Sequence, residues 1–338
     1  MNTAEVLALK EILSTPKNVV IVPHKNPDGD AMGSTLGLYH YLKKIGHSAT
    51  VIAPNDYPEF LKWIPGTNEV LIHEMQTNKA EALLTQADLI FTLDFNALHR
   101  CGAMESPIKN ATAIKVMIDH HQQPDAYATF VYSDVSMCST CEMVYHFIDK
   151  MGDLDQIDVP IGEALYTGIM TDTASFRFPL TTSTTHRVIA HLIDVGVDKS
   201  TIHNAVYDTN SFSRLQLMGC ALNNLKYIED SNTAYISLST NELETHNFQK
   251  GDTEGLVNCG LSLKGAKFAV IFIEHQQEGI IKISFRSKGT FDVNAFARTH
   301  FDGGGHKNAS GGRSTLNLED TIAKFISILA DYKSELQT

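Results

Sequence analysis

Short apolar runs alternate with stretches of helical periodicity through the first part of the chain. The run Val19-Val20-Ile21-Val22 has the continuous apolar character of a buried strand, and the apolar residues of 35–42 then recur at helical spacing. The same alternation repeats several times, which predicts an α/β domain whose parallel sheet is covered by helices. The predicted strands are 19–22, 50–53, 69–73, 88–93 and 113–118, and the predicted helices are 5–13, 35–42, 78–86, 140–150, 161–171 and 182–194.

The pattern changes near residue 227, where strands and short turns replace the regular alternation. Strands are predicted at 234–238, 268–274 and 280–285, followed by helices at 293–298 and 319–336. We therefore predict a smaller C-terminal α/β domain with a mixed sheet, and a cleft between the two domains. The predicted boundaries are 1–195 for the first domain, 196–226 for a helical linker and 227–338 for the second domain.

Composition fits this two-domain prediction and limits the partners of the protein. The chain has 338 residues, of which 43% are hydrophobic, and a net charge of −12. That acidity argues against a broad basic face for long nucleic acid, but a local basic pocket or bound metal ions can still hold a small phosphorylated molecule. The five cysteines lack the spacing of a disulfide framework, and Cys138 and Cys141 are expected to pack at a helix start. With neither a signal-peptide pattern nor an apolar run of membrane-spanning length, a cytoplasmic location without membrane association is expected.

Acidic and histidine residues follow three of the predicted strands. Because the carboxyl ends of parallel strands share one edge of a sheet, where α/β proteins bind ligands, we expect these side chains to converge. For the turn 24–34 alone, helix capping by Asp30 or Ser34 is an equally good interpretation. The recurrence at separate strand ends favours chemistry over capping. The residues are His24, Asp28 and Asp30 after the first strand, Asp94 after another, and Asp119, His120 and His121 after a third.

Asp172 extends this set from a helix. It follows the small and apolar segment 164–170, so the helix is predicted to be buried. Its neighbours Thr171 and Thr173 allow the alternative that Asp172 only ends the helix through hydrogen bonds. A buried carboxylate is costly without a partner, however, and a shared cation is the partner that the other acidic residues suggest.

A glycine-rich stretch at 303–312 marks the second domain. Successive glycines can turn their backbone N–H groups toward an anion, and an arginine adds a bidentate phosphate contact. A flexible loop without a role is the alternative, and the order of residues excludes a Walker A loop. We favour phosphate binding by Arg286, Gly303, Gly304, Gly305, His306 and Ser310.

Together these motifs resemble the DHH phosphoesterase family with its associated C-terminal domain, and within it the nano-RNase and pAp phosphatase subfamily. The resemblance rests on Asp119-His120-His121, the turn His24-x3-Asp28-x-Asp30, Asp94, Asp172 and the Gly-Gly-Gly-His stretch. It implies two divalent metal ions, for which carboxylate and imidazole ligands favour Mn²⁺ over Mg²⁺ or Co²⁺. The implied ligands are His24, Asp28 and Asp94 for one ion and Asp30, Asp94, His120 and Asp172 for the other. The implied catalytic residues are Asp94, His121 and Asp119, with Asp119 orienting His120.

The resemblance also implies a function. We expect hydrolysis of very short RNA to nucleoside monophosphates, dephosphorylation of pAp, or cleavage of linear dinucleotides, by water activated between two metals. Long duplex nucleic acid is not an expected substrate, and a homodimer is a plausible assembly. The alternatives are an inorganic pyrophosphatase or exopolyphosphatase, which would share the metal site, and a non-catalytic nucleotide-binding sensor that kept the fold.

Overall fold

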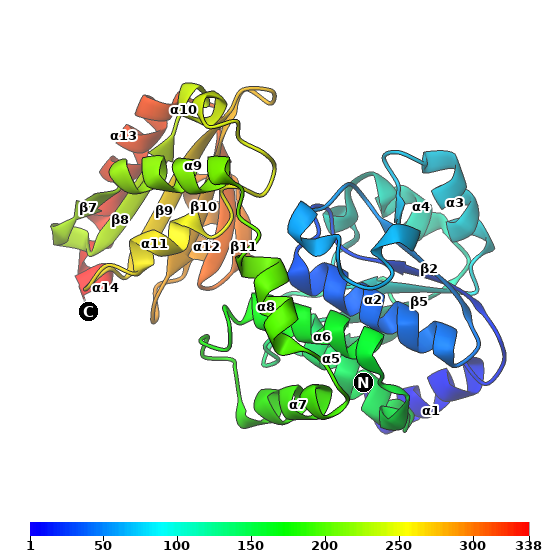
Figure 1. Cartoon of the computed structure of the whole chain (residues 1–338). Coiled ribbons are helices and arrows are strands. Elements are labelled where there is room, and N and C mark those ends of the chain that lie inside the picture. Colours follow the sequence, from blue (N-terminus) through cyan, green and yellow to red (C-terminus); the bar gives the residue numbers. More distant parts are fainter. Residues whose placement is uncertain (338) are drawn as a thin grey trace. The chain divides into compact units, whose positions relative to one another are not determined.

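The computed structural model describes residues 1–337, which form two compact units, Met1–Thr209 and a second unit that begins at Asn210. The boundary falls inside the segment 196–226, which was predicted to be a helical linker. This segment contains the helices α8 (Lys199–Tyr207) and α9 (Phe212–Asn223), and each belongs to a different unit. Each unit contains one six-stranded sheet within the described residues (Figure 1).

The sheet of the first unit is entirely parallel, as predicted. Its strand order is β3-β2-β1-β4-β5-β6, and β1 lies at the centre between β2 and β4. The edge strand β6 was not predicted, because a four-residue strand with only two buried side chains gives little periodic signal. The strands are β1 (Asn18–Val22), β2 (Ser48–Ala53), β3 (Leu71–Ile72), β4 (Leu89–Leu93), β5 (Ile114–Asp119) and β6 (Phe130–Ser133).

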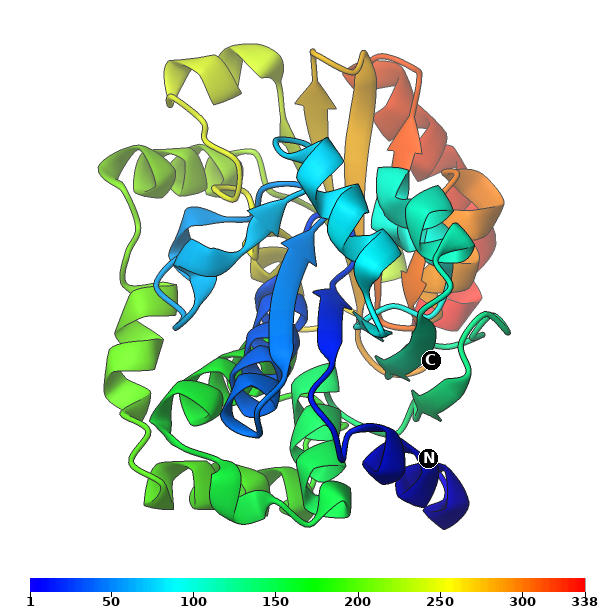
Figure 2. The ribbon, with the colours of Figure 1, turned by 90° about the vertical axis from the view of Figure 1, so that its right-hand side faces the viewer.

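Helices cover both faces of this sheet, so the central strands β1 and β4 are mostly apolar and buried. One face packs against a core shared with α2, α5 and α6, and the other packs against α3 and α4, with α3 drawn in cyan in Figure 2. Residues 1–337 form no helix that is both long enough and apolar enough to cross a membrane. The helices of the unit, besides α8, are α1 (Thr3–Ile12), α2 (Gly29–Lys44), α3 (Thr77–Gln86), α4 (Glu105–Asn110), α5 (Thr140–Met151), α6 (Val159–Asp172) and α7 (Ser183–Asp194).

A glycine lets α6 approach α2 closely. A Cβ atom at Gly168 would lie 3.0 Å from the Cα atom of Asp30 and would also collide with the thiol of Cys141. Without a side chain at this position, α6 packs directly against the first turn of α2 and the start of α5. This contact directs the end of α6, and therefore Asp172, toward the carboxyl edge of the sheet.

The second unit has the predicted mixed sheet, in the order β11-β12-β10-β9-β8-β7, with only the β8–β9 pair parallel among the described residues. The helices α12 and α13 pack on one face of this sheet through a phenylalanine-rich core, and α9, α10 and α11 cover the other face. The strands are β7 (Lys226–Ile228), β8 (Thr233–Leu238), β9 (Phe268–His275), β10 (Ile280–Ser287), β11 (Gly304–His306) and β12 (Ala309–Ser314). The remaining helices are α10 (Thr240–Thr245), α11 (Leu256–Leu261), α12 (Val293–His300), α13 (Leu318–Leu329) and α14 (Lys333–Gln337).

The ends of this unit differ from the sequence prediction in one respect. The helix predicted over 319–336 is divided into α13 and α14 by a short 3₁₀ segment, Ala330–Tyr332. Tyr332 packs its ring against Phe291 and Phe296 of the apolar core. We attribute the division of the helix to this packing of the half-buried Tyr332 ring, which sequence periodicity does not record.

Candidate metal centre

The turn after β1 places two of the predicted ligands beside the end of β4. The Nε2 atom of His24 lies 3.3 Å from Oδ2 of Asp94 and 3.9 Å from Oδ2 of Asp28. The His24 side chain is only 12% exposed, and Asp94 is buried. His24, Asp28 and Asp94 therefore form one group of possible ligands at the carboxyl edge of the sheet.

Asp28 also caps α2, which corrects the capping alternative. Its Oδ1 atom accepts hydrogen bonds from the backbone N–H groups of Asp30 and Ala31, and α2 begins at Gly29 rather than near residue 35. Ser34 lies inside the helix, where its hydroxyl donates to the carbonyl of Ala31. Asp28 therefore caps α2 with one carboxylate oxygen and faces His24 with the other.

A second group of possible ligands lies on the other side of Asp94. The Nε2 atom of His120 is 3.8 Å from Oδ2 of Asp30, 3.6 Å from Oδ2 of Asp172 and 3.5 Å from Oδ1 of Asp94. Asp30, His120 and Asp94 are buried, whereas the Asp172 side chain is 30% exposed. The structure thus brings together residues from α2, β4, β5 and α6 that are far apart in the sequence.

Asp94 is a member of the first group, contacts His120 of the second group and has an unusual backbone conformation. Its φ angle is +64°, in the left-handed region that non-glycine residues seldom adopt, and its N–H donates to the carbonyl of Ile118 in β5. Oδ2 faces His24, and Oδ1 faces His120. This strained position at the end of β4 divides one carboxylate between two clusters, which is the geometry expected of a shared ligand.

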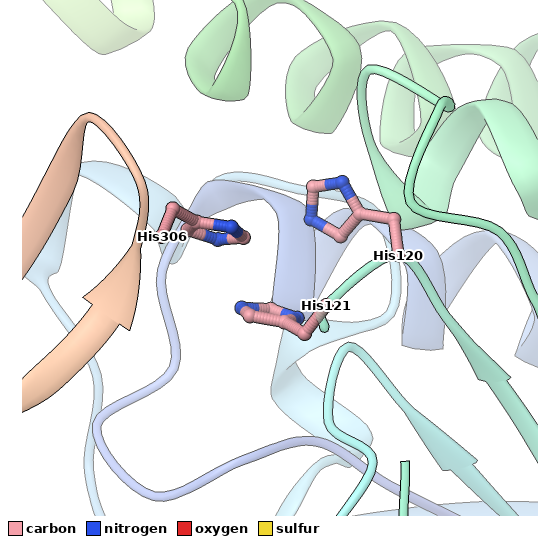
Figure 3. A group of neighbouring side chains, drawn as sticks. All are labelled: His120, His121 and His306. Carbon is pink, nitrogen blue, oxygen red and sulfur yellow. The ribbon is translucent and has the colours of Figure 1, made fainter. Parts of the chain in front are cut away.

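Asp119 is paired with His121, so the prediction that Asp119 orients His120 is wrong. The two oxygens of Asp119 accept from the backbone N–H of His121 at 2.8 Å and contact its Nδ1 atom at 2.7 Å. The Nδ1 atom of His120 instead lies 3.2 Å from the carbonyl of Met137. The ring planes of the two imidazoles are inclined at 79°, and both side chains are labelled in Figure 3. The backbone turns after Asp119, which directs the adjacent histidines to different partners.

The pKa values of His24, Asp30 and Asp94 are shifted by burial and by the charges of their neighbours. Burial disfavours the charged imidazole of His24, but the contacts with Asp94 and Asp28 outweigh it and raise the pKa of His24 to about 8. Burial and the nearby charges of Asp94 and Asp172 raise the pKa of Asp30 well above its usual range. In contrast, the contacts of Asp94 with His120 and His24 outweigh burial and hold its pKa well below its usual range. Several buried carboxylates therefore compete for little positive charge.

The spacing of these groups suits a divalent ion. Charge-assisted hydrogen bonds are about 2.7–2.9 Å long, and the contacts of His24 and His120 with carboxylates, at 3.3–3.9 Å, exceed that length. Two donors that bind one ion at about 2.0–2.2 Å each lie roughly 3–4 Å apart, depending on the angle between the two bonds. Carboxylate oxygens and imidazole nitrogens are also donors that Mn²⁺ and Mg²⁺ accept. The residues present therefore supply a donor set that fits divalent metal ions.

The predicted phosphate-binding residues lie in the second unit, on β10 and the β11–β12 hairpin. Arg286 pairs in register with Ala309, and Gly303 has no room for a side chain beside the carbonyl of Gly311. The stretch is therefore a hairpin with fixed pairing, rather than the open nest of N–H groups that was predicted. The N–H of Gly305 donates to Oδ1 of Asn294, and the hydroxyl of Ser310 donates to the carbonyl of His306, the histidine labelled in Figure 3.

Sequence reasoning missed three residues that hold the centre in place. Thr140 and the following N–H group contact Asp30 and Asp94, Asn55 binds the turn that follows β1, and Asn96 donates to the carbonyls of residues 121 and 122. Each is a small polar residue near the end of an element, which is an ordinary position for a cap or turn residue. Only their contacts with residues far away in the sequence distinguish them.

Comparison with known proteins gives an independent view of the same residues. The family described as "DHH family, N-terminal domain" matches residues 18–169, and the "DHHA1 domain" matches residues 232–335. The chain is 30% identical to the "Bifunctional oligoribonuclease and PAP phosphatase NrnA" of Thermus thermophilus over 318 residues, which cover 94% of this chain and 90% of that protein. The protein of the same name from Bacillus subtilis is 27% identical over 302 residues, 88% of this chain and 90% of that protein.

A solved structure is similar over the whole chain. It is the crystal structure of an exopolyphosphatase-related protein from Bacteroides fragilis, which superposes with a TM-score of 0.97 at 39% identity. The match covers 100% of this chain and 98% of that chain. The structural match therefore extends over both units of this chain.

Proposed function

The chain belongs to the DHH family of phosphoesterases, and from this we propose that it hydrolyses very short RNA oligonucleotides to nucleoside monophosphates and pAp to AMP, with linear dinucleotides as further substrates. The observation that carries the proposal is the division of the Asp94 carboxylate between two ligand groups. The similarity to the oligoribonuclease and PAP phosphatase of Thermus thermophilus supports the choice of substrates. The proposed assembly is a cytoplasmic homodimer.

In this proposal the two ligand groups each hold one divalent ion, most favourably Mn²⁺. His24 and Asp28 bind one ion, and Asp94 is the ligand common to the two. A pair of such ions lowers the pKa of a water molecule and stabilises negative charge on phosphate oxygens. Asp30, His120 and Asp172 complete the second group.

The residues of the protein contribute orientation and proton transfer. When Nδ1 of His121 carries a proton, it donates to Oδ1 of Asp119. The other ring nitrogen, Nε2, is then the atom that can contact the substrate. We propose that His121 contacts the reacting phosphate or the leaving oxygen through Nε2. The carboxylate of Asp119, which is completely buried, fixes the ring and stabilises its positive charge when it holds a second proton.

Arg286 is the proposed phosphate contact of the second unit. Its planar guanidinium can bind a phosphate group in a bidentate manner, and it lies on the face of β10 opposite the apolar core. Hydrogen bonds from Gly305 and Ser310 hold the hairpin of β11 and β12 in place, which favours a fixed rather than a flexible contact with phosphate. The proposed phosphate-binding residues of this segment are Gly303, Gly304, Gly305, His306 and Ser310. Together with a net charge of −12, a small number of basic contacts favours short substrates over long nucleic acid.

An exopolyphosphatase or pyrophosphatase is the second candidate function. It is favoured by the similarity to the exopolyphosphatase-related protein from Bacteroides fragilis. The same metal centre could hydrolyse a phosphoanhydride, because such substrates also present phosphate oxygens to a pair of ions. The two candidates therefore differ in what the second unit binds, namely a nucleoside or only phosphate.

A substrate panel tests the proposal. The purified protein is incubated with Mn²⁺, Mg²⁺ or Co²⁺ and with di- to pentaribonucleotides, pAp, pApA, pyrophosphate or polyphosphate, and the products are separated by ion-exchange chromatography. We expect nucleoside monophosphates and AMP, with no turnover in the presence of a chelator. Faster release of phosphate from polyphosphate or pyrophosphate than from the nucleotides would favour the second candidate. Intact nucleotides under all conditions would overturn the proposal, and tight nucleotide binding without turnover would indicate a sensor.

A further inference from the structure

Thr140, the first residue of α5, contacts two of the carboxylates in the metal centre. Its hydroxyl donates to Oδ1 of Asp94 at 2.9 Å, and its backbone N–H donates to Oδ2 of Asp30 at 2.6 Å. The N–H of Cys141 donates to the other oxygen of Asp30 at 2.8 Å. Thr140 and Cys141 are completely buried, so water does not compete for these hydrogen bonds.

These contacts explain how the protein holds two neighbouring carboxylates in fixed orientations. Each oxygen of Asp30 accepts from one N–H group at the start of α5, where Ser139 is the helix cap and the positive end of the helix dipole favours negative charge. Asp94 has no such pair of N–H donors in this contact. Its Oδ1 atom accepts from the Thr140 hydroxyl, and its Oδ2 atom remains directed toward His24.

We propose that Thr140 is a positioning residue for the metal centre, which sets the rotation of the Asp94 carboxylate relative to Asp30 and so determines which oxygen faces each ligand group. This inference rests on the proposed metal-dependent function. Asp94 has a left-handed backbone at the end of β4, and the Thr140 hydroxyl is a buried donor that faces one of its two carboxylate oxygens. Thr140 contacts Asp30 through its backbone N–H and Asp94 through its hydroxyl, so the orientations of both carboxylates depend on the position of α5.

Substitution of Thr140 by valine tests the contribution of the hydroxyl separately from that of the backbone N–H and the side-chain shape. Thr140→Val keeps the shape of the side chain and the backbone N–H that holds Asp30, and removes only the donor to Asp94. Thr140→Ser keeps the donor. Thr35→Val is the matched control, because Thr35 is also completely buried, but its hydroxyl donates to the carbonyl of Ala31 within its own helix.

The test measures Mn²⁺ binding to the metal-free proteins by isothermal titration calorimetry, together with kcat and KM for a diribonucleotide. Loss of a group that orients a metal ligand lowers metal affinity or activity about 10–100-fold, so we expect Thr140→Val to weaken Mn²⁺ binding about tenfold or more. We also expect kcat to fall while KM stays nearly constant. Thr140→Ser and Thr35→Val should retain the binding and kcat of the wild type. If Thr140→Val does not fold, Thr140→Ala replaces it with the same expectation.

Two results would overturn this role of Thr140. One is wild-type Mn²⁺ affinity in Thr140→Val, and the other is equal loss in Thr140→Ser, which would make packing rather than the hydroxyl responsible. The failure of the proposed function has a different signature. A wild-type protein that binds Mn²⁺ but leaves all nucleotides intact contradicts that function, whereas the comparison of metal affinities still decides the role of Thr140.

Discussion

Asn26 and Asn55 exchange two hydrogen bonds at the edge of the candidate metal centre. The backbone N–H of Asn26 donates to Oδ1 of Asn55 at 2.7 Å, and the amide of Asn55 donates to Oδ1 of Asn26 at 3.0 Å. Asn26 has a φ angle of +56°, so the turn between His24 and Asp28 passes through a left-handed residue. Asn55, which is 5% exposed and follows β2, therefore ties this turn to the neighbouring strand.

Replacement of Asn55 by alanine is expected to loosen that turn. The change removes the partner of the Asn26 N–H, and the loss of such a partly buried hydrogen bond costs about 0.5–1.5 kcal/mol. We expect a lower midpoint in thermal unfolding, together with a decrease in kcat/KM because His24 and Asp28 lose their fixed positions. Asn55→Asp keeps the accepting oxygen and should be impaired less than Asn55→Ala. Unchanged unfolding and activity in Asn55→Ala would contradict the role of the pair.

Removal of Asp94 is expected to abolish turnover. Asp94→Ala removes the only carboxylate that lies within reach of both His24 and His120 among the described residues, so both ligand groups become incomplete. Binding of Mn²⁺, followed by calorimetry, should weaken for each ion. Asp88→Ala serves as the control, because Asp88 accepts from the N–H of Asn18 at the opposite end of the same strand. Full activity in Asp94→Ala would contradict the proposed two-metal site.

Replacement of Arg286 by alanine is expected to act on substrate binding rather than on the chemical step. A hydrogen bond to a charged group contributes about 1.5–3 kcal/mol, which corresponds to an increase in KM of roughly ten- to hundredfold for a dinucleotide. We expect kcat to change little. Lys282→Ala is the control, since Lys282 lies on the same face of β10 but pairs with Glu278. A fall in kcat without a change in KM would assign Arg286 to a different role.

The stability of the first unit is expected to depend on Glu142 in acid. The buried carboxylate accepts from the Cys138 thiol at 2.8 Å and from the Thr185 hydroxyl at 2.9 Å. Burial opposes its charge, but His146 and these donors outweigh burial and hold the pKa of Glu142 below its ordinary value. The charge of Glu142 therefore stabilises the fold at pH values above the ordinary pKa of glutamate. This contribution is lost as the pH falls through the lowered pKa of Glu142.

Glu142→Gln tests this dependence. Loss of the charge should destabilise the protein by about 1–3 kcal/mol near pH 7. Because the wild-type carboxylate becomes protonated in acid, the difference between the two proteins should shrink below about pH 4.5, the region in which a glutamate ordinarily titrates. Urea unfolding at a series of pH values measures this difference. A difference that stays constant from pH 7 to pH 3 would contradict the assignment to the Glu142 charge.

The fold was predictable where burial leaves a strong local pattern. The strands at 19–22, 88–93 and 113–118 correspond closely to β1, β4 and β5, because a strand covered on both faces is a nearly continuous apolar run. The edge strand β6 and the hairpin of β11 and β12 were missed. A short edge strand buries few side chains, and the hairpin is built largely from glycines, whose pairing depends on backbone geometry rather than on hydrophobicity.

The sequence by itself determined which chemistry is present. Acidic and histidine residues at three strand ends and after one predicted helix predict a group of metal ligands, because parallel strands end at a common edge. The tertiary structure alone decided how those residues are paired and oriented. Asp119 holds His121 rather than His120, Asp28 caps α2 while it faces His24, and Thr140 reaches Asp94 across 46 positions of the sequence. Such pairings depend on atomic distances between segments that only packing brings together, and no local pattern records them.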